Sequence, residues 1–167
     1  MFVRQYCQGK VLDKIDLRSI TTYQAGATQA TMHRKLQKLC DIILRPFGIT
    51  KMQWLIIGTV LDAGSNGVRV SDLAAQLGTT LSYLTNSVNL LESRGILERI
   101  DNTQDTRSRL IVVREQYRPT CVEIEATLRD GLRSTIYSSI DPAEFAVYIK
   151  VMRQLANVTV PTDELPT

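Results

Sequence analysis

Polar side chains recur at helical spacing in the middle of this 167-residue chain. On a helix, one face would carry Ser82, Tyr83, Asn86 and Asn89. No acidic residue joins this face before Glu92. An asparagine can form two hydrogen bonds to the edge of an adenine, and hydroxyl groups can bond bases or phosphates. The plainer interpretation is a solvated helix face that binds nothing, and the neighbouring segments help to decide between the two.

A second polar group lies in the segment 101–109, which contains no glycine. Asp105 and Arg107 stand two residues apart in it. The carboxylate could hold the guanidinium by a charge-assisted bond and aim it outward. An arginine aimed in this way suits a narrow minor groove, where negative potential is concentrated. The alternative is a surface ion pair worth roughly 0–1 kcal/mol.

Two short helices are predicted to position these side chains. Ser71 is the expected N-cap of the first helix, and Gly78 is expected to end it in a left-handed conformation. Thr79 or Thr80 would cap the second helix, which Gly95 would end. At spacings of three and four residues, the buried stripe of the second helix would be Leu81, Leu84, Val88 and Leu91.

A β-hairpin is predicted on either side of the polar loop, from residues 95–100 and the β-branched run 110–113. A short strand is also expected at Val68, before the first helix. Residues 68–114 then read strand, helix, turn, helix and hairpin. This order is typical of a winged helix-turn-helix, in which the second helix enters a DNA groove.

The same segment resembles the MarR family of bacterial regulators. The family's Leu-Glu-x-x-Gly-like segment and its Asp-x-Arg wing signature are matched here by Leu91, Glu92, Gly95, Asp105 and Arg107. The resemblance implies a dimer that binds double-stranded DNA, with an affinity altered by small anionic aromatic ligands or by cysteine oxidation. The chain departs from the family's pattern at Asn86 and Leu90, where an arginine is common.

Charge supports nucleic-acid binding only modestly. The net charge is +3, but residues 68–114 contain six basic and five acidic residues, whereas residues 1–51 contain nine and three. Some phosphate contacts are therefore expected from the N-terminal third, at Arg4, Lys10, Lys14 or Arg18. The predicted DNA contacts within the winged segment are Ser71, Thr80, Ser82, Tyr83, Thr85, Asn86, Asn89, Arg99, Asp105, Arg107 and Arg109.

Helices are predicted on both sides of the winged segment. They cover residues 19–45, the stretch after a Thr50–Gln53 capping box, a stretch from about 114–119 to 138, and the stretch after an Asp141–Glu144 cap. Their apolar stripes have no partner sheet, so a second copy of the chain is expected to cover them. The predicted fold is mainly α with a small β-hairpin wing. Its parts are an arm and dimerisation helix at 1–48, a winged helix-turn-helix at 49–114, and C-terminal dimerisation helices with a tail at 115–167.

Other chemistry finds little support. His33 is the single histidine and has no nucleophile at a recognisable offset, so an enzyme is not expected. Cys7, Cys40 and Cys121 lack metal-ligand spacing, and no metal or cofactor is expected. No signal peptide or membrane-spanning run is seen, which favours the cytoplasm.

Three alternatives stay open for the function. The chain is predicted to be a homodimeric DNA-binding regulator, most simply a repressor of a near-palindromic site. It could also respond to a small anionic aromatic ligand that binds in a crevice lined by His33, Trp54 and Tyr117. Another possible signal is oxidation of Cys7, which is otherwise an ordinary thiol in a loose arm. As an alternative, the nearly neutral winged segment could be a protein–protein docking module without DNA affinity.

Overall fold

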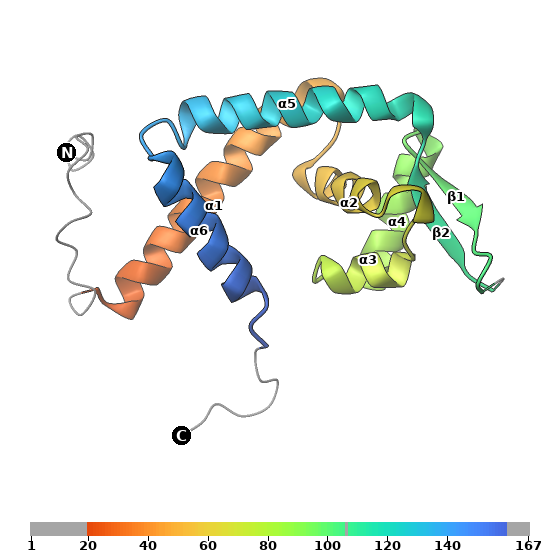
Figure 1. Ribbon diagram of the computed structural model, residues 1–167, viewed down its shortest axis with the longest axis horizontal. Coiled ribbons are helices and arrows are strands. Elements are labelled where there is room, and N and C mark those ends of the chain that lie inside the picture. Colours follow the sequence, from red (N-terminus) through yellow and green to blue (C-terminus); the bar gives the residue numbers. More distant parts are fainter. Residues whose placement is uncertain (1–19, 106, 160–167) are drawn as a thin grey trace. The chain divides into compact units, whose positions relative to one another are not determined.

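The computed structural model describes residues 20–105 and 107–159. Helices predominate in the described residues, and two strands form an antiparallel hairpin, as the sequence predicts (Figure 1). In chain order the elements are α1 (Thr22–Leu44), η3 (Arg45–Phe47), α2 (Lys51–Asp62), η4 (Gly64–Asn66), α3 (Val70–Gln76), α4 (Leu81–Ser93), β1 (Leu97–Asp101), β2 (Arg109–Val113), η5 (Glu115–Tyr117), α5 (Arg118–Thr135) and α6 (Pro142–Ala156). The chain divides into two compact units, one spanning Thr22–Gly131 and the other including Leu132–Thr167.

The larger unit is built around one hydrophobic core. Side chains from α2, α3, α4, the hairpin and α5 meet in it together with Leu44 of α1, and half-buried residues of α1 pack against its edge. Among the core side chains without exposed surface are Leu44, Ile56, Ile57, Val60, Leu73, Leu84, Val88, Leu91, Leu97, Ile111 and Ile124. Burial of this many branched side chains supplies the main stabilising free energy of the unit.

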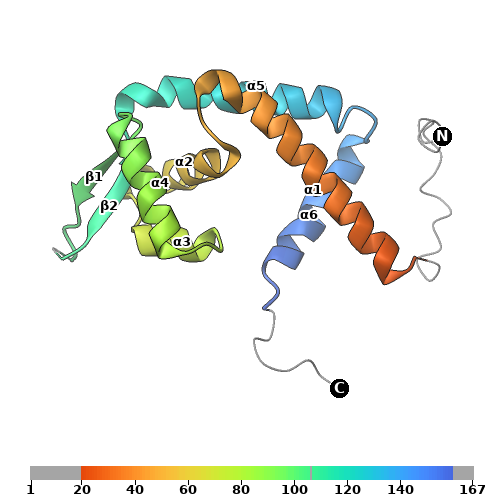
Figure 2. The same cartoon turned by 180° about the vertical axis from the view of Figure 1, so that it is seen from behind.

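The hairpin lies beside α4, and both views of the fold show it at the edge of the α2–α4 group (Figure 2). Its register pairs Leu97 with Val113 at one end and Asp101 with Arg109 at the other. The short strand expected at Val68 is a single bridge to Ile111. The Val68 amide donates to the Ile111 carbonyl at 3.1 Å, and the Ile111 amide donates back at 2.9 Å.

The start of α3 corrects one prediction. Ser71 is not the N-cap: α3 begins at Val70, and the cap position belongs to Arg69, whose side chain makes no capping hydrogen bond. The reason is the bridge to β2, which holds the chain extended up to Arg69 and lets the helix begin immediately after it. Gly78 does follow the helix with a φ of 60°.

The start of α4 confirms one prediction and corrects another. Thr80 is the N-cap, and its hydroxyl accepts from the Tyr83 amide at 3.3 Å. Leu81 was expected in the buried stripe, but 54% of it is exposed. Helical side chains lean toward the N-terminus, so a residue in the first position projects past the end of the helix and away from the core. The rest of the stripe, Leu84, Val88 and Leu91, is buried.

A close approach between α1 and α5 explains a glycine in the interior of a helix. A Cβ at Gly131 would lie 2.5 Å from the Cδ1 atom of Ile43. The glycine lowers the intrinsic stability of α5 but lets the backbone pass this close to α1.

The smaller unit contains α6, which begins with the predicted capping box of Asp141 and Glu144. Three aromatic rings cluster in this unit, and the ring centroids of Tyr137 and Phe145 are 4.6 Å apart. None of the residues of α6 is buried. Its apolar side therefore carries exposed Val147, Val151, Met152 and Leu155.

A glycine at residue 67 lets the chain lie close against β2. Gly67 has a φ of 65°, and a Cβ there would lie 3.0 Å from atoms of Leu110, Ile111 and Val112. We expect Gly67→Ala to lower the free energy of unfolding by about 1–3 kcal/mol for a positive φ combined with an extended ψ, which is a conformation of glycine, and by about 1–3 kcal/mol more for displacing β2. Urea denaturation of the purified protein measures the loss.

Gly64→Ala is the matched control for this substitution. Gly64 also has a positive φ, of 61°, but nothing lies within 4 Å of a Cβ built there. It should show only the backbone cost. Equal losses in the two variants would contradict a role for close packing between residue 67 and β2.

Candidate nucleic-acid interface

The surface of α4 is determined by the side it buries. Leu84, Val88 and Leu91 point into the core, so the opposite side faces solvent. We call this side the outer face of α4; its exposed residues are Ser82, Tyr83, Asn86, Asn89 and Leu90. Thr85 lies at its margin, half-buried, and its hydroxyl donates to the Leu81 carbonyl at 2.8 Å. The outer face thus offers amide and hydroxyl groups at helical spacing.

Arg99 ties the first strand of the hairpin to α4. Its guanidinium donates to the Asn89 side-chain oxygen at 2.6 Å and forms an ion pair with Glu92. Such charge-assisted bonds are stronger than neutral ones and set the direction of both partners. Sequence reasoning named Arg99 and Asn89 as separate DNA contacts and missed their bond. A signal was present, since Glu92 and Arg99 have opposite charges on either side of the Gly95 turn.

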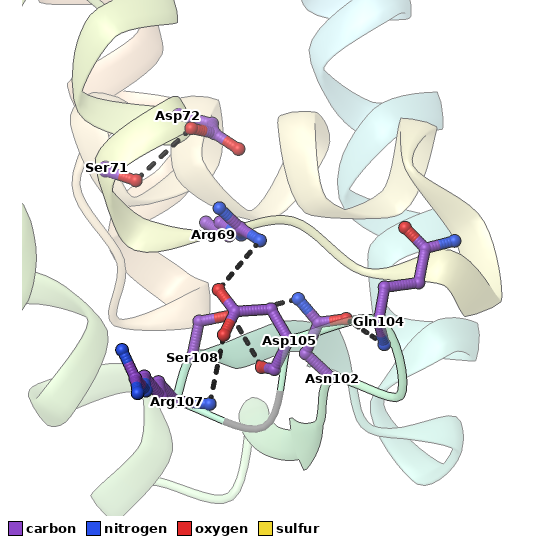
Figure 3. Close-up of polar contacts among 8 residues, drawn as sticks. All are labelled: Arg69, Ser71, Asp72, Asn102, Gln104, Asp105, Arg107 and Ser108. Carbon is purple, nitrogen blue, oxygen red and sulfur yellow. Dashed lines mark hydrogen bonds and ion pairs between the residues drawn. The ribbon is translucent and has the colours of Figure 1, made fainter.

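The loop of the hairpin corrects the predicted pairing of Asp105. Its carboxylate does not bind the guanidinium of Arg107 but accepts from Arg69 at 3.1 Å, 36 residues earlier in the chain (Figure 3). The Val68–Ile111 bridge brings Arg69 next to the loop. The other carboxylate oxygen accepts the backbone amide of Arg107 at 3.1 Å, a bond that is common two residues after an aspartate.

Further hydrogen bonds shape the same loop from within (Figure 3). The Asn102 side chain is buried; its amide nitrogen donates to the Ser108 hydroxyl at 2.9 Å, and its oxygen accepts from the Gln104 amide at 3.0 Å. The Ser108 hydroxyl donates to the Asp105 carbonyl at 3.1 Å. These bonds give the loop a defined conformation without a glycine.

The cations near this surface differ in how far they are engaged. Arg94 donates to the Gly48 carbonyl at 2.8 Å. Arg109 forms a solvent-exposed ion pair with Asp101 at 3.2 Å. The Arg107 guanidinium makes no ion pair with any residue that the structure describes, and its side chain extends away from the Asp105 carboxylate in Figure 3. Arg107 is therefore the wing cation that is free to meet an external anion.

The remaining predicted contacts lie beside these groups. Ser71 is exposed on α3, and its hydroxyl donates to the Asp72 carboxylate at 3.2 Å. Thr80 is exposed, but its hydroxyl is used as the cap of α4. Ser71 and Thr80, both predicted to contact DNA, therefore have hydrogen-bond partners within the protein.

The residues predicted to line a ligand crevice have different surroundings in the structure. His33 is exposed on α1, where it lines a shallow surface hollow with its α1 neighbours and Arg45. Trp54 is half-buried against the core, as is Tyr117. Burial raises the pKa of the Tyr117 hydroxyl, with the nearby Cys121 as a smaller cause.

The two described cysteines are poor candidates for a redox site. Burial raises the pKa of the Cys40 thiol, and it does the same to the pKa of Cys121. A thiol with a raised pKa contains less of the reactive thiolate at neutral pH. Cys7, the predicted redox residue, lies outside the described residues, as do Arg4, Lys10, Lys14 and Arg18.

No group of three or more His, Cys, Asp or Glu side chains is placed to hold a metal ion in the described ranges. No helix within residues 20–105 and 107–159 is both long and apolar enough to cross a membrane.

The helix-turn-helix, the hairpin and their shared core define a winged helix-turn-helix protein. The family model of the MarR family matches residues 47–108, which include α2, α3, α4, β1 and the hairpin loop and end just before β2. Over residues 47–108 the chain matches the MarR family, which is a family of transcriptional regulators.

Known relatives agree with this assignment. An uncharacterised helix-turn-helix transcriptional regulator of Bacillus subtilis, YhbI, is 26% identical over 140 residues, which are 83% of this chain and 86% of YhbI. CouR from Rhodococcus jostii RHA1, solved with p-coumaroyl-CoA, has a TM-score of 0.73 at 19% identity, covering 82% of this chain and 94% of CouR. A cysteine-to-serine mutant of MarR from E. coli, solved with operator DNA, has a TM-score of 0.67 at 21% identity, covering 78% and 91%. The two structures support the fold.

The two bonds of Asp105 can be separated by substitution. Asp105→Asn keeps an oxygen for the Arg107 amide but removes the charge that holds Arg69, so we expect at most about 1 kcal/mol of lost stability. Asp105→Ala also removes the acceptor and should cost about 1 kcal/mol more. Urea denaturation gives the free energies, and hydrogen exchange should show that the Arg107 amide stays protected in the asparagine variant and loses its protection in the alanine variant.

Asp101→Ala serves as the control, because it removes the partner of Arg109 in an exposed pair of the same hairpin. It should leave the stability and the Arg107 exchange rate unchanged. Identical behaviour of the two Asp105 variants would show that the backbone bond does not shape the loop.

Proposed function

We propose that this regulator binds double-stranded DNA in a sequence-specific way, with α4 in the major groove and the Arg107 wing in the adjacent minor groove. The observation that carries the proposal is the outer face of α4, whose polar groups are exposed to solvent. Next to it lies the wing, where the guanidinium of Arg107 makes no ion pair with any described residue and the loop is held by the hydrogen bonds of Asp105. Amide and hydroxyl groups on a helix can reach base edges, and arginine suits a narrow minor groove.

The regulator would act as a homodimer. Apolar side chains are exposed on α6 and at the start of α1, and burying them against a second copy is the commonest solution for such faces. A twofold dimer would present two α4 helices to successive major grooves about 34 Å apart, which requires a near-palindromic site. On such a site the simplest action is repression, in the cytoplasm where the DNA lies.

Release of the DNA would depend on a small anionic aromatic ligand or on oxidation of Cys7. The solved complex of CouR with p-coumaroyl-CoA supports the ligand route for a protein of this fold. His33, Trp54 and Tyr117 are the residues of this chain to substitute first, because an imidazole and two aromatic side chains suit an anionic aromatic molecule.

A protein–protein docking module is the second candidate. The observation that favours it is the exposure of Tyr83 and Leu90 on the outer face of α4, since exposed apolar groups often mark contact surfaces. The outer face of α4 would then meet a partner protein, and the chain would bind no duplex above background.

Arg107→Ala tests the DNA-binding proposal. We expect weaker binding to every duplex and a salt dependence reduced by about one phosphate contact, because the lost guanidinium meets the backbone or minor groove. Fluorescence anisotropy with DNA from the region upstream of the protein's own coding sequence, over a range of salt concentrations, measures both quantities. Arg129→Ala, which removes an exposed arginine of α5, is the control and should bind as the wild type does. If wild type and Arg107→Ala bind all duplexes equally weakly, the proposal fails.

Met152→Glu tests the homodimer. Met152 is exposed on the apolar side of α6, so a carboxylate there would be buried in the interface and should weaken the dimer at least about tenfold. Sedimentation equilibrium measures the dissociation constant. Gln154→Glu adds the same charge at an exposed polar position of α6 and should leave it unchanged. A monomeric wild type at micromolar concentration would contradict the dimer.

A further inference from the structure

Two apolar side chains stand on the outer face of α4 on either side of Asn86. Tyr83 is 47% exposed and Leu90 is 49% exposed. The three residues are three and four positions apart, so they form one ridge along the helix. Residues at this spacing line the side of a homeodomain's recognition helix that enters the major groove. The ridge thus combines one amide with two apolar groups where base edges would lie.

The same helix lacks the chemistry for reading guanine. Guanine is most often bound by the paired donors of an arginine or by a lysine. The thirteen residues of α4 include no lysine, arginine or histidine. The nearby guanidinium groups are engaged within the protein, Arg99 with Asn89 and Glu92, and Arg94 with the Gly48 and Phe47 carbonyls.

The groups that are present match an A·T base pair. An asparagine amide can donate to and accept from adenine, and an apolar side chain can contact the methyl group of thymine, which cytosine lacks. We propose that the outer face of α4 selects A·T-rich half-sites, with Asn86 on an adenine and with Tyr83 and Leu90 on thymine methyl groups at neighbouring steps. This inference rests on the proposed DNA-binding function and names the sequence class that the site accepts.

The wing supports the same selection independently. Arg107 is exposed and makes no ion pair within the described part of the chain. A free arginine at a wing is attracted most strongly by the narrow minor groove of A-tracts. Both DNA-facing elements therefore favour the same base pairs, one through the methyl groups and the other through groove width.

The experiment replaces thymine by uracil, which keeps the pairing edge and loses only the methyl group. The full-length protein is used to select from duplexes with a randomised 20-base-pair centre, and the enriched duplex is then made with thymine or with uracil. We expect A·T-rich half-sites and about fourfold tighter binding for each contacted methyl group, measured by fluorescence anisotropy.

Substitutions assign the methyl contacts to side chains. Leu90→Ala and Tyr83→Ala should each weaken binding to the thymine duplex and leave binding to the uracil duplex unchanged, so the thymine-to-uracil ratio falls toward one. Leu81→Ala is the matched control: Leu81 is 54% exposed but nine residues from Leu90, on the opposite side of the helix. It should keep the wild-type ratio. Asn86→Ala should reduce the preference for the selected duplex about fivefold to 100-fold.

The outcomes separate this inference from the function beneath it. Sequence-specific binding with G·C-rich half-sites, or with equal affinity for the thymine and uracil duplexes, overturns the inference and leaves DNA binding intact. If no duplex is enriched and all bind equally weakly, DNA binding itself fails, and the apolar ridge is then a surface for a protein partner. Thermal unfolding followed by circular dichroism should be the same for all four variants, since each replaced side chain is exposed.

Discussion

Burial of Leu84, Val88 and Leu91 determines how α4 is rotated on the molecule. These side chains have no exposed surface, and turning the helix would bring them into water at a cost of about 1.5–3 kcal/mol each. The rotation in turn decides that Ser82, Asn86 and their neighbours face outward. The surface offered to a ligand is therefore set by packing on the other side of the same helix.

Three arginines connect elements that are distant in the sequence. Arg69 joins the start of α3 to the wing loop, Arg99 joins β1 to α4, and Arg94 joins the end of α4 to the turn before α2. Each bond limits the motion of a loop or strand next to the outer face of α4. Each bond also engages a guanidinium group within the protein, so that this group is not available to bind a phosphate. These three arginines of the winged helix-turn-helix therefore serve the structure, and the outer face of α4 is left to amides, hydroxyls and apolar groups.

The apolar residues of the chain are divided between two purposes. In the larger unit they form a closed core that extends from Leu44 to Leu128. On α6 they remain exposed, because a single short helix with an aromatic cluster cannot cover its own apolar side. The proposed assembly with a second copy and the proposed recognition of a duplex would then depend on different surfaces.

Local sequence determined the features that depend on residues a few positions apart. The capping boxes at Thr50 and Asp141, the left-handed Gly78, the Thr80 cap and the hairpin all follow from contacts within one turn or between adjacent strands. Tertiary structure alone decided the rest. Asp105 binds Arg69 because a bridge between Val68 and Ile111 brings together residues 36 positions apart, and the same bridge moves the start of α3 ahead of Ser71. Tertiary contacts also explain the glycines at 67 and 131. Gly67 lies against β2 and Gly131 lies against α1, and neither contact can be inferred from the residues next to these glycines in the sequence.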